Sequence, residues 1–160
     1  MKRINFDKDW SFFVGKVDFF TLLQAKGTPV NLPHDYEITT NPDKDTPEGK
    51  LTGFFKGNVV SYVKNLFVPL EWKDHSIILE FDGSYMNTEI FLNGMFVENY
   101  HHGYSPFHID LTGRLNYGEE NRLIVVVNNS APNNARWYSG TGIYRHVDLL
   151  VGPKVRLEPW

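Results

Sequence analysis

The segment Ile90-Phe-Leu-Asn-Gly-Met-Phe-Val97 decides the fold class of this chain. It joins two short apolar runs through Asn93-Gly94, a pair typical of a two-residue hairpin turn, because such a turn needs a positive φ at both residues. Side chains alternate between the two faces of a strand, and Ile90 and Leu92 fall on one face with Phe91 on the other. The segment therefore predicts an antiparallel hairpin.

The same alternation recurs along the rest of the chain. Each run is short and is bounded by Gly, Pro, Asn or Asp, which is the pattern of a strand followed by a turn. Further strands are predicted at residues 59–67, 77–81, 107–111, 123–127 and 143–151. The last two runs carry apolar residues on both faces, which predicts interior positions within a sheet.

Helix is expected to be scarce, since no stretch of ten or more residues keeps helical periodicity without proline or glycine. Many short strands joined by long loops favour two sheets packed around one core. The sequence therefore predicts an all-β fold, a two-sheet β-sandwich of the jelly-roll type. Residues 29–57 and 128–138 fit a plain sandwich poorly. Long ordered loops are often functional, although a mobile surface loop is the commoner explanation.

Composition limits the classes of partner. The length suits one domain, residues 1–160. The 16 basic and 19 acidic residues give a net charge of -3, which favours neither nucleic acid nor an acidic membrane surface. The absence of cysteine excludes disulfides and thiol catalysis, and no run approaches the roughly 18 apolar residues of a membrane span. A soluble protein is expected, with the compartment open: cytoplasmic, or periplasmic or secreted if a signal peptide was removed.

The loop Arg136-Trp-Tyr-Ser-Gly-Thr-Gly-Ile-Tyr-Arg145 is the richest in displayed side chains. A guanidinium offers a fork of donors that suits vicinal hydroxyls, and an indole face stacks on the apolar face of a pyranose. Arg136 and Trp137 are therefore candidate ligand-binding residues. The alternative is that Trp137 fills the core or a domain interface, with Arg136 packed against it. Tyr138 is expected to be structural.

His34 and Asp35 form a second candidate pair, able to bond sugar hydroxyls or to fix their loop against another domain. A loop aspartate equally often binds local backbone N–H groups. His101 and His102 are a poor metal pattern, because adjacent ligands lack a spaced third partner. We therefore expect no metal site and no cofactor.

Five motifs, in order, resemble the N-terminal sugar-binding domain of glycoside hydrolase family two, the family of β-galactosidases, β-glucuronidases and β-mannosidases. The motifs are Asp9-Trp-Ser-Phe12 with Gly15, Asn31-Leu-Pro-His-Asp35, Ser61-Tyr-Val-Lys64 with Phe67-Val-Pro69 and Trp72, Phe91-Leu-Asn-Gly94 with Gly103-Tyr-Ser-Pro-Phe107 and Asp110-Leu-Thr112, and the loop from Arg136 to Arg145. The chain departs from the family pattern at Tyr36 and Ser61, where Trp is usual, and at Val63, where Arg is usual. It departs also at Tyr100, where His is frequent, and at His102, where Gly is frequent. The resemblance covers nearly the whole chain.

The resemblance implies a galactose-binding-domain-like jelly roll that is one non-catalytic part of a retaining exo-β-glycosidase. In such enzymes an immunoglobulin-like domain follows the sugar-binding domain, and a (β/α)8 barrel comes next. Two glutamates on that barrel cleave the glycosidic bond. Neither of these two domains fits within 160 residues. In several relatives the position matching Arg136 points into the active-site pocket of the barrel. Sugar is the ligand that the family resemblance of the whole chain implies for Arg136 and Trp137. We therefore expect a fragment that shapes one wall of an active site without turning over substrate.

The implied partners are a terminal β-linked sugar and the immunoglobulin-like and barrel domains of a parent chain. The form of the 136–145 loop favours galactose and a β-galactosidase. Two alternatives remain open: an independent carbohydrate-binding module, since fold alone does not settle function, and a purely structural interdomain scaffold.

Overall fold

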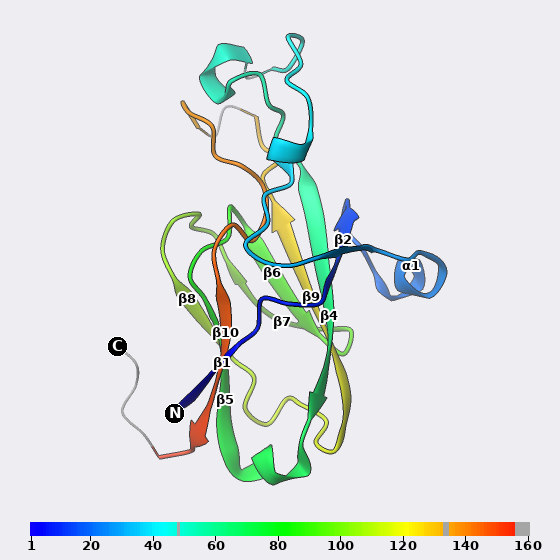
Figure 1. Ribbon diagram of the computed structural model, residues 1–160, viewed down its shortest axis with the longest axis vertical. Coiled ribbons are helices and arrows are strands. Elements are labelled where there is room, and N and C mark those ends of the chain that lie inside the picture. The colour runs from blue at the N-terminus through cyan, green and yellow to red at the C-terminus, as the bar shows by residue number, and fades with distance from the viewer. Residues whose placement is uncertain (48, 133–134, 156–160) are drawn as a thin grey trace.

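Two antiparallel sheets pack face to face in the computed structural model, which describes residues 1–47, 49–132 and 135–155 (Figure 1). The four-stranded sheet has the order β1 (Lys2–Asn5), β10 (Val147–Pro153), β5 (His75–Phe81) and β8 (Phe107–Asp110). The six-stranded sheet has the order β3 (Thr28–Val30), β2 (Trp10–Val14), β4 (Val59–Val68), β9 (Glu119–Asn128), β6 (Thr88–Leu92) and β7 (Met95–Tyr100). The predicted all-β jelly-roll sandwich is confirmed.

Helix is as scarce as expected in the described residues. It is confined to α1 (Phe19–Gln24) and to three 3-10 turns, η1 (Glu37–Thr39), η2 (Gly49–Thr52) and η3 (Leu70–Asp74). Asp18 caps α1, because its carboxylate accepts a hydrogen bond of 2.7 Å from the Thr21 N–H.

The predicted hairpin forms at β6 and β7. Asn93 and Gly94 have φ values of 52° and 82°, the positive values that a two-residue primed turn requires. The predictions of interior strands are also confirmed, since β9 lies between β4 and β6, and β10 lies between β1 and β5.

The predicted strand at residues 143–151 was wrong at its start, because β10 begins only at Val147. The preceding residues form hydrogen bonds with a loop instead of a sheet. The N–H of His34 donates to the Ile143 carbonyl, and the N–H of Tyr36 donates to the Thr141 carbonyl. Ile143 is nevertheless fully buried, so its apolar character reflects the core rather than a strand.

The core lies between the inner faces of the two sheets. Alternate residues of β5, Ile77, Leu79 and Phe81, are fully buried against Val125 and Leu123 of β9 within one cluster. This arrangement follows from the period-two patterning of both strands.

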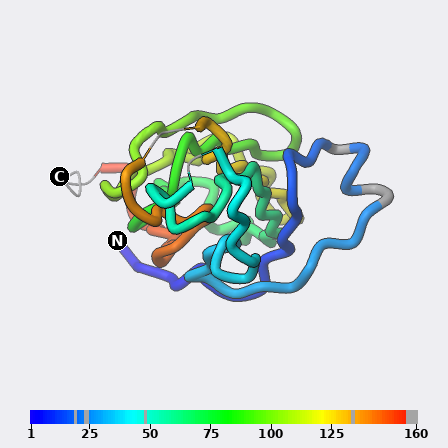
Figure 2. The backbone as a smooth tube through the Cα atoms, turned by 90° about the horizontal axis from the view of Figure 1, so that it is seen from above, coloured from blue at the N-terminus to red at the C-terminus, as the bar shows by residue number. Residues whose placement is uncertain are grey.

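A second, smaller cluster lies on the outer face of the six-stranded sheet. Val63, Ile124 and Val126 point outward from β4 and β9 and are covered by Val17 and Leu22 of the segment that carries α1. Figure 2 shows this segment projecting from the side of the sandwich. It covers only part of the outer face.

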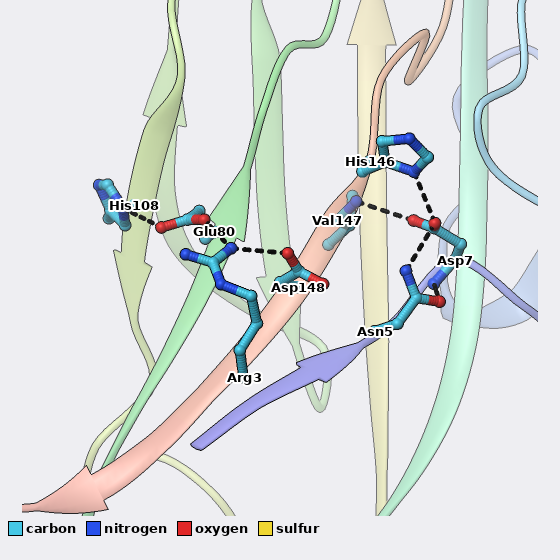
Figure 3. A network of polar contacts seen from close by, with 8 residues as sticks. All are labelled: Arg3, Asn5, Asp7, Glu80, His108, His146, Val147 and Asp148. Atoms are coloured by element: carbon cyan, nitrogen blue, oxygen red, sulfur yellow. Dashed lines mark hydrogen bonds and ion pairs between the residues drawn. The ribbon is translucent and has the colours of Figure 1, made fainter. Parts of the chain in front are cut away.

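The outer face of the four-stranded sheet carries charged side chains instead (Figure 3). Arg3 pairs with Glu80 and, at 2.6 Å, with Asp148, while His108 lies 2.7 Å from the other Glu80 oxygen. Burial alone would raise the pKa of Glu80, but the hydrogen bonds from Arg3 and His108 hold it below its ordinary value.

Asp7 joins the start of β10 to the segment after β1. Its carboxylate accepts hydrogen bonds from the Val147 N–H at 2.9 Å and from Asn5 at 2.7 Å, and it lies 2.7 Å from His146 Nδ1 (Figure 3). Burial acts to raise the pKa of Asp7, and these three partners outweigh it and lower the pKa. The hydrogen bond between Asp7 and His146 in turn raises the pKa of His146.

Two long loops meet at one end of the sandwich. Residues 31–57 lead from β3 to β4, and residues 129–146 lead from β9 to β10. They lie beside one another at the top of Figure 1, and Figure 2, which is seen from above, shows them over the end of the sheets. The sequence motifs richest in polar and aromatic residues therefore converge at this end.

Candidate functional site

Arg136, Trp137 and Tyr138 lie side by side in the chain on the exposed part of the 129–146 loop. The Trp137 side chain is 57 % exposed, which is inconsistent with a place in the core of this domain. Arg136 is also exposed, and within the described ranges of the chain its guanidinium makes no hydrogen bond or ion pair. An unpartnered guanidinium beside an exposed indole is available to a ligand or to a neighbouring domain.

Trp137 is oriented by a residue from a different loop. Its indole N–H donates a hydrogen bond of 2.6 Å to the Tyr104 hydroxyl, and the Tyr104 ring packs against the ring of Tyr85 at 5.1 Å. Tyr85 is buried, so it anchors this aromatic row to the body of the domain. The contact holds the N–H edge of the indole, while Trp137 as a whole stays 57 % exposed.

Asp35 holds the other side of the loop. One carboxylate oxygen accepts hydrogen bonds from the N–H groups of Glu37 and Thr141, each at 3.0 Å. The second oxygen accepts a bond of 2.6 Å from the Tyr138 hydroxyl. Burial, followed by this bond, raises the pKa of Tyr138 well above its ordinary value, so the phenol stays a proton donor to Asp35.

Glu37 and Asn129 also hold the 129–146 loop, through hydrogen bonds to Gly140 and Thr141. The Thr141 hydroxyl donates to the Glu37 carboxylate, which is only 3 % exposed. The Asn129 amide donates to the Gly140 carbonyl at 2.7 Å and to the Thr141 hydroxyl at 3.2 Å. Residues from both loops therefore fix the backbone of Gly140 and Thr141.

Gly140 allows this close approach. Its φ is +71°, and a Cβ added there would lie 2.6 Å from a carboxylate oxygen of Asp35. Such a distance is shorter than a van der Waals contact, and the oxygen is already committed to Tyr138. Only glycine satisfies both the conformation and the space at this position.

His34 lies next to Asp35 but faces the core. Its Nδ1 is 2.8 Å from the Tyr62 hydroxyl, and its ring packs on Phe12 at 4.7 Å. Burial lowers the pKa of His34 below its ordinary value, so it is neutral at pH 7. The structure thus brings His34, Asp35 and the 136–138 side chains, two separate candidates in the sequence, to the same end of the sandwich. A role for any of them in binding sugar stays a prediction.

Two carboxylates at this end of the sandwich are engaged in hydrogen bonds within the chain. The two carboxylates that converge on Thr141, those of Asp35 and Glu37, both accept hydrogen bonds from their own chain, and Glu37 is buried. Neither has the free, solvent-facing geometry that a nucleophile or general acid needs.

The described residues hold no group of three or more His, Cys, Asp or Glu side chains placed to bind a metal ion. In the same part of the chain, no helix has the length and apolar character needed to cross a membrane.

Sequence reasoning missed three supporting residues, Tyr104, Glu37 and Asn129. Tyr104 stands within the Gly103-Tyr-Ser-Pro-Phe107 motif, so its neighbourhood was marked but its contact with Trp137 was not. Glu37 and Asn129 carried no pattern, because a buried polar residue in a long loop looks like an ordinary loop residue.

The fold and this loop define a class: a jelly-roll domain that displays an aromatic and arginine-bearing loop at one end. Residues 22–153 match the family described as "Glycosyl hydrolases family 2, sugar binding domain". The chain belongs to this family.

Several relatives of the chain are glycosidases about five times as long as this chain. The chain is 35 % identical over 164 residues to the β-galactosidase BoGH2A of Bacteroides ovatus, with 99 % of this chain and 19 % of that protein covered. It is 28 % identical to a β-glucuronidase of Bacteroides fragilis, with 96 % and 21 % covered. A solved glycosyl hydrolase family 2 member from Bacteroides cellulosilyticus superposes with a TM-score of 0.88 at 33 % identity, covering 96 % of this chain and 21 % of that one. The chain thus spans about a fifth of the length of these relatives.

Proposed function

We propose that this chain is the N-terminal, non-catalytic domain of a longer retaining exo-β-glycosidase, and that its 136–138 loop forms one wall of the active site. The catalytic glutamates, on this proposal, lie on a barrel domain elsewhere in that longer chain. The family membership and the fivefold greater length of the relatives support this view.

The observation that carries the proposal is the contrast within the loop. Gly140 and Thr141 are tied down by Asp35, Glu37 and Asn129, while Arg136 and Trp137 are left exposed. A rigid base under unsatisfied binding groups is the arrangement expected where a loop presents side chains to a ligand held by another domain.

We further propose that the terminal sugar is galactose. The form of the 136–145 loop and the name of the β-galactosidase relative support this choice. Glucuronate is the competing substrate, because other relatives are named as β-glucuronidases.

The test is to express the longer chain and the 160-residue chain separately and to assay aryl β-galactoside and aryl β-glucuronide. The longer chain is expected to cleave the galactoside faster, and the 160-residue chain to cleave neither. Turnover by the purified 160-residue chain, persisting after removal of host glycosidases, contradicts the assignment. Preference for the glucuronide overturns only the choice of galactose.

A further inference from the structure

A surface hollow lies on the outer face of the six-stranded sheet, away from the 31–57 and 129–146 loops. The segment that carries α1 covers this face near Val63 and Val126. Beside the β6–β7 turn, at Asn93 and Gly94, a surface cavity of about 700 Å³ opens, which we call the β9 groove. Its volume is within the range of roughly 300 to 1,000 Å³ usual for small-molecule sites. The lining used below consists of Asn65, Asn93, Asn116, Glu120, Arg122 and Ile124.

The β9 groove is remote from Arg136. The β4–β9 ladder pairs Asn65 with Arg122 and, six residues further along β9, Val59 with Asn128, where the 129–146 loop begins. Six residues of strand span about 20 Å. A ligand in the groove is therefore separate from one held by the loop.

Part of the lining is a rigid frame. The Arg122 backbone N–H donates to the Asn93 side-chain oxygen at 2.9 Å, and the Asn93 amide donates to Asn121 at 2.8 Å. Arg122 Nε also donates to the Asn65 oxygen at 3.2 Å. These bonds orient the side chains on two adjacent strands and the hairpin turn.

Several polar atoms of the lining have no partner in the described part of the chain. These are the terminal nitrogens of Arg122, the amide nitrogen of Asn65, the side-chain amide of Asn116 and the carboxylate of Glu120. Donors and an acceptor thus line one hollow, above an apolar floor at Ile124. Phe67, which is 55 % exposed and pairs with Glu120 in the ladder, offers an open aromatic side chain on the same face.

The chemistry of the lining selects a type of ligand. One guanidinium and one carboxylate cancel in charge, so neither an anion nor a cation is favoured. Each sugar hydroxyl is both a donor and an acceptor, which matches this mixture of amide, guanidinium and carboxylate. The C–H face of a pyranose suits Ile124 and the ring of Phe67.

We propose that the β9 groove is an accessory binding site for a neutral oligosaccharide, distinct from the 136–138 loop. A protein partner fits the lining less well, because the centre of a protein interface is depleted of charged residues. The proposal does not depend on the proposed function, since it involves none of the same side chains.

The experiment is an amide NMR titration of the isotope-labelled 160-residue chain with cellotetraose and with β-1,4-galactotetraose. An oligogalacturonate of the same length serves as the charged control. The expected result is saturable shifts at Asn93, Arg122 and Ile124 with one or both neutral sugars, at a millimolar dissociation constant, and weaker binding of the charged sugar. Millimolar affinity is what a few hydrogen bonds achieve after the costs of association.

Three variants make the test specific. Arg122→Ala is expected to weaken binding about tenfold, the effect of losing a hydrogen bond to a charged group, and Asn65→Ala to weaken it severalfold. Arg136→Ala is expected to leave the groove shifts unchanged. Each variant is checked for an unchanged melting temperature.

Several outcomes overturn the proposal. These are an absence of saturable shifts, shifts confined to residues 135–141, or shifts that survive both Arg122→Ala and Asn65→Ala. The proposal is also overturned if the groove signals shift when the protein concentration is raised in the absence of sugar. Such shifts would show that the groove binds another protein copy instead.

Discussion

Replacing Asp35 by alanine separates the two roles that this residue was given. In the structure its carboxylate accepts three hydrogen bonds, from the N–H groups of Glu37 and Thr141 and from the Tyr138 hydroxyl. A hydrogen bond to a charged group contributes about 1.5 to 3 kcal/mol. Asp35 is partly exposed, so water replaces part of each bond in the variant, and we take about 1 kcal/mol for each. Asp35→Ala is therefore expected to lower the free energy of unfolding by about 3 kcal/mol.

This loss corresponds to a fall in melting temperature of roughly 6 to 12 °C for a domain of this size. The assay is urea unfolding followed by tryptophan fluorescence, with a thermal melt in parallel. Asp35→Asn keeps one carbonyl oxygen for the two N–H groups and should lose only about 1 kcal/mol.

The matched control is Asp45→Ala, an exposed aspartate of the same 31–57 loop. It should change stability by less than about 0.5 kcal/mol. If Asp35→Ala is no less stable than Asp45→Ala, the carboxylate does not hold the loop, and the account of the loop's rigid base is refuted.

Three further predictions concern the core, the charged face and catalysis. Leu92→Ala should lower unfolding free energy by about 2 to 5 kcal/mol in urea titrations, because Leu92 is buried. The pKa of His146 is raised in the folded chain, so its protonation stabilises the fold at pH values below its ordinary pKa of 6.5. This stabilisation is lost as the pH rises past the raised pKa of the folded state. His146→Gln should flatten that part of the pH–stability profile, and the loss at acid pH from Asp7 should become smaller, because His146 is one of the partners that lower the pKa of Asp7. The 160-residue chain should release no nitrophenol from aryl β-galactosides.

The fold was predictable because its information is local and repeated. Alternating side chains at residues 77–81 and the Asn93-Gly94 turn each allow one structure, and two-faced apolar runs such as 123–127 identified an interior strand. The start of β10 was not predictable in this way. Residues 143–146 alternate like a strand, but the Ile143 carbonyl accepts a hydrogen bond from the His34 N–H, a contact over more than 100 residues that no local pattern encodes. The His146 carbonyl accepts one from the Asp82 N–H.

The sequence marked the exposed residues Arg136 and Trp137, and also Asp35, but not the long-range contacts that support the site. Arg136 and Trp137 stand out because their residue types have few other uses in a loop. The supports are different, since Asp35 reaches Tyr138 across 103 residues and Glu37 reaches Thr141 across 104. Such pairs depend on how two loops meet at the end of the sandwich, and one sequence alone does not show it.

The most direct test of the central claim is the kinetics of Arg136→Ala in the longer chain, compared with Arg114→Ala, an exposed arginine outside the 129–146 loop. If Arg136 binds the sugar in the transition state, kcat/KM for an aryl β-galactoside should fall severalfold to about a hundredfold, since one charge-assisted hydrogen bond contributes about 1.5 to 3 kcal/mol. The melting temperature should stay nearly unchanged, and Arg114→Ala should behave as the unaltered enzyme. A variant that melts early while its folded fraction keeps normal kcat/KM shows instead that Arg136 is structural, and contradicts the assignment of this loop to the active site.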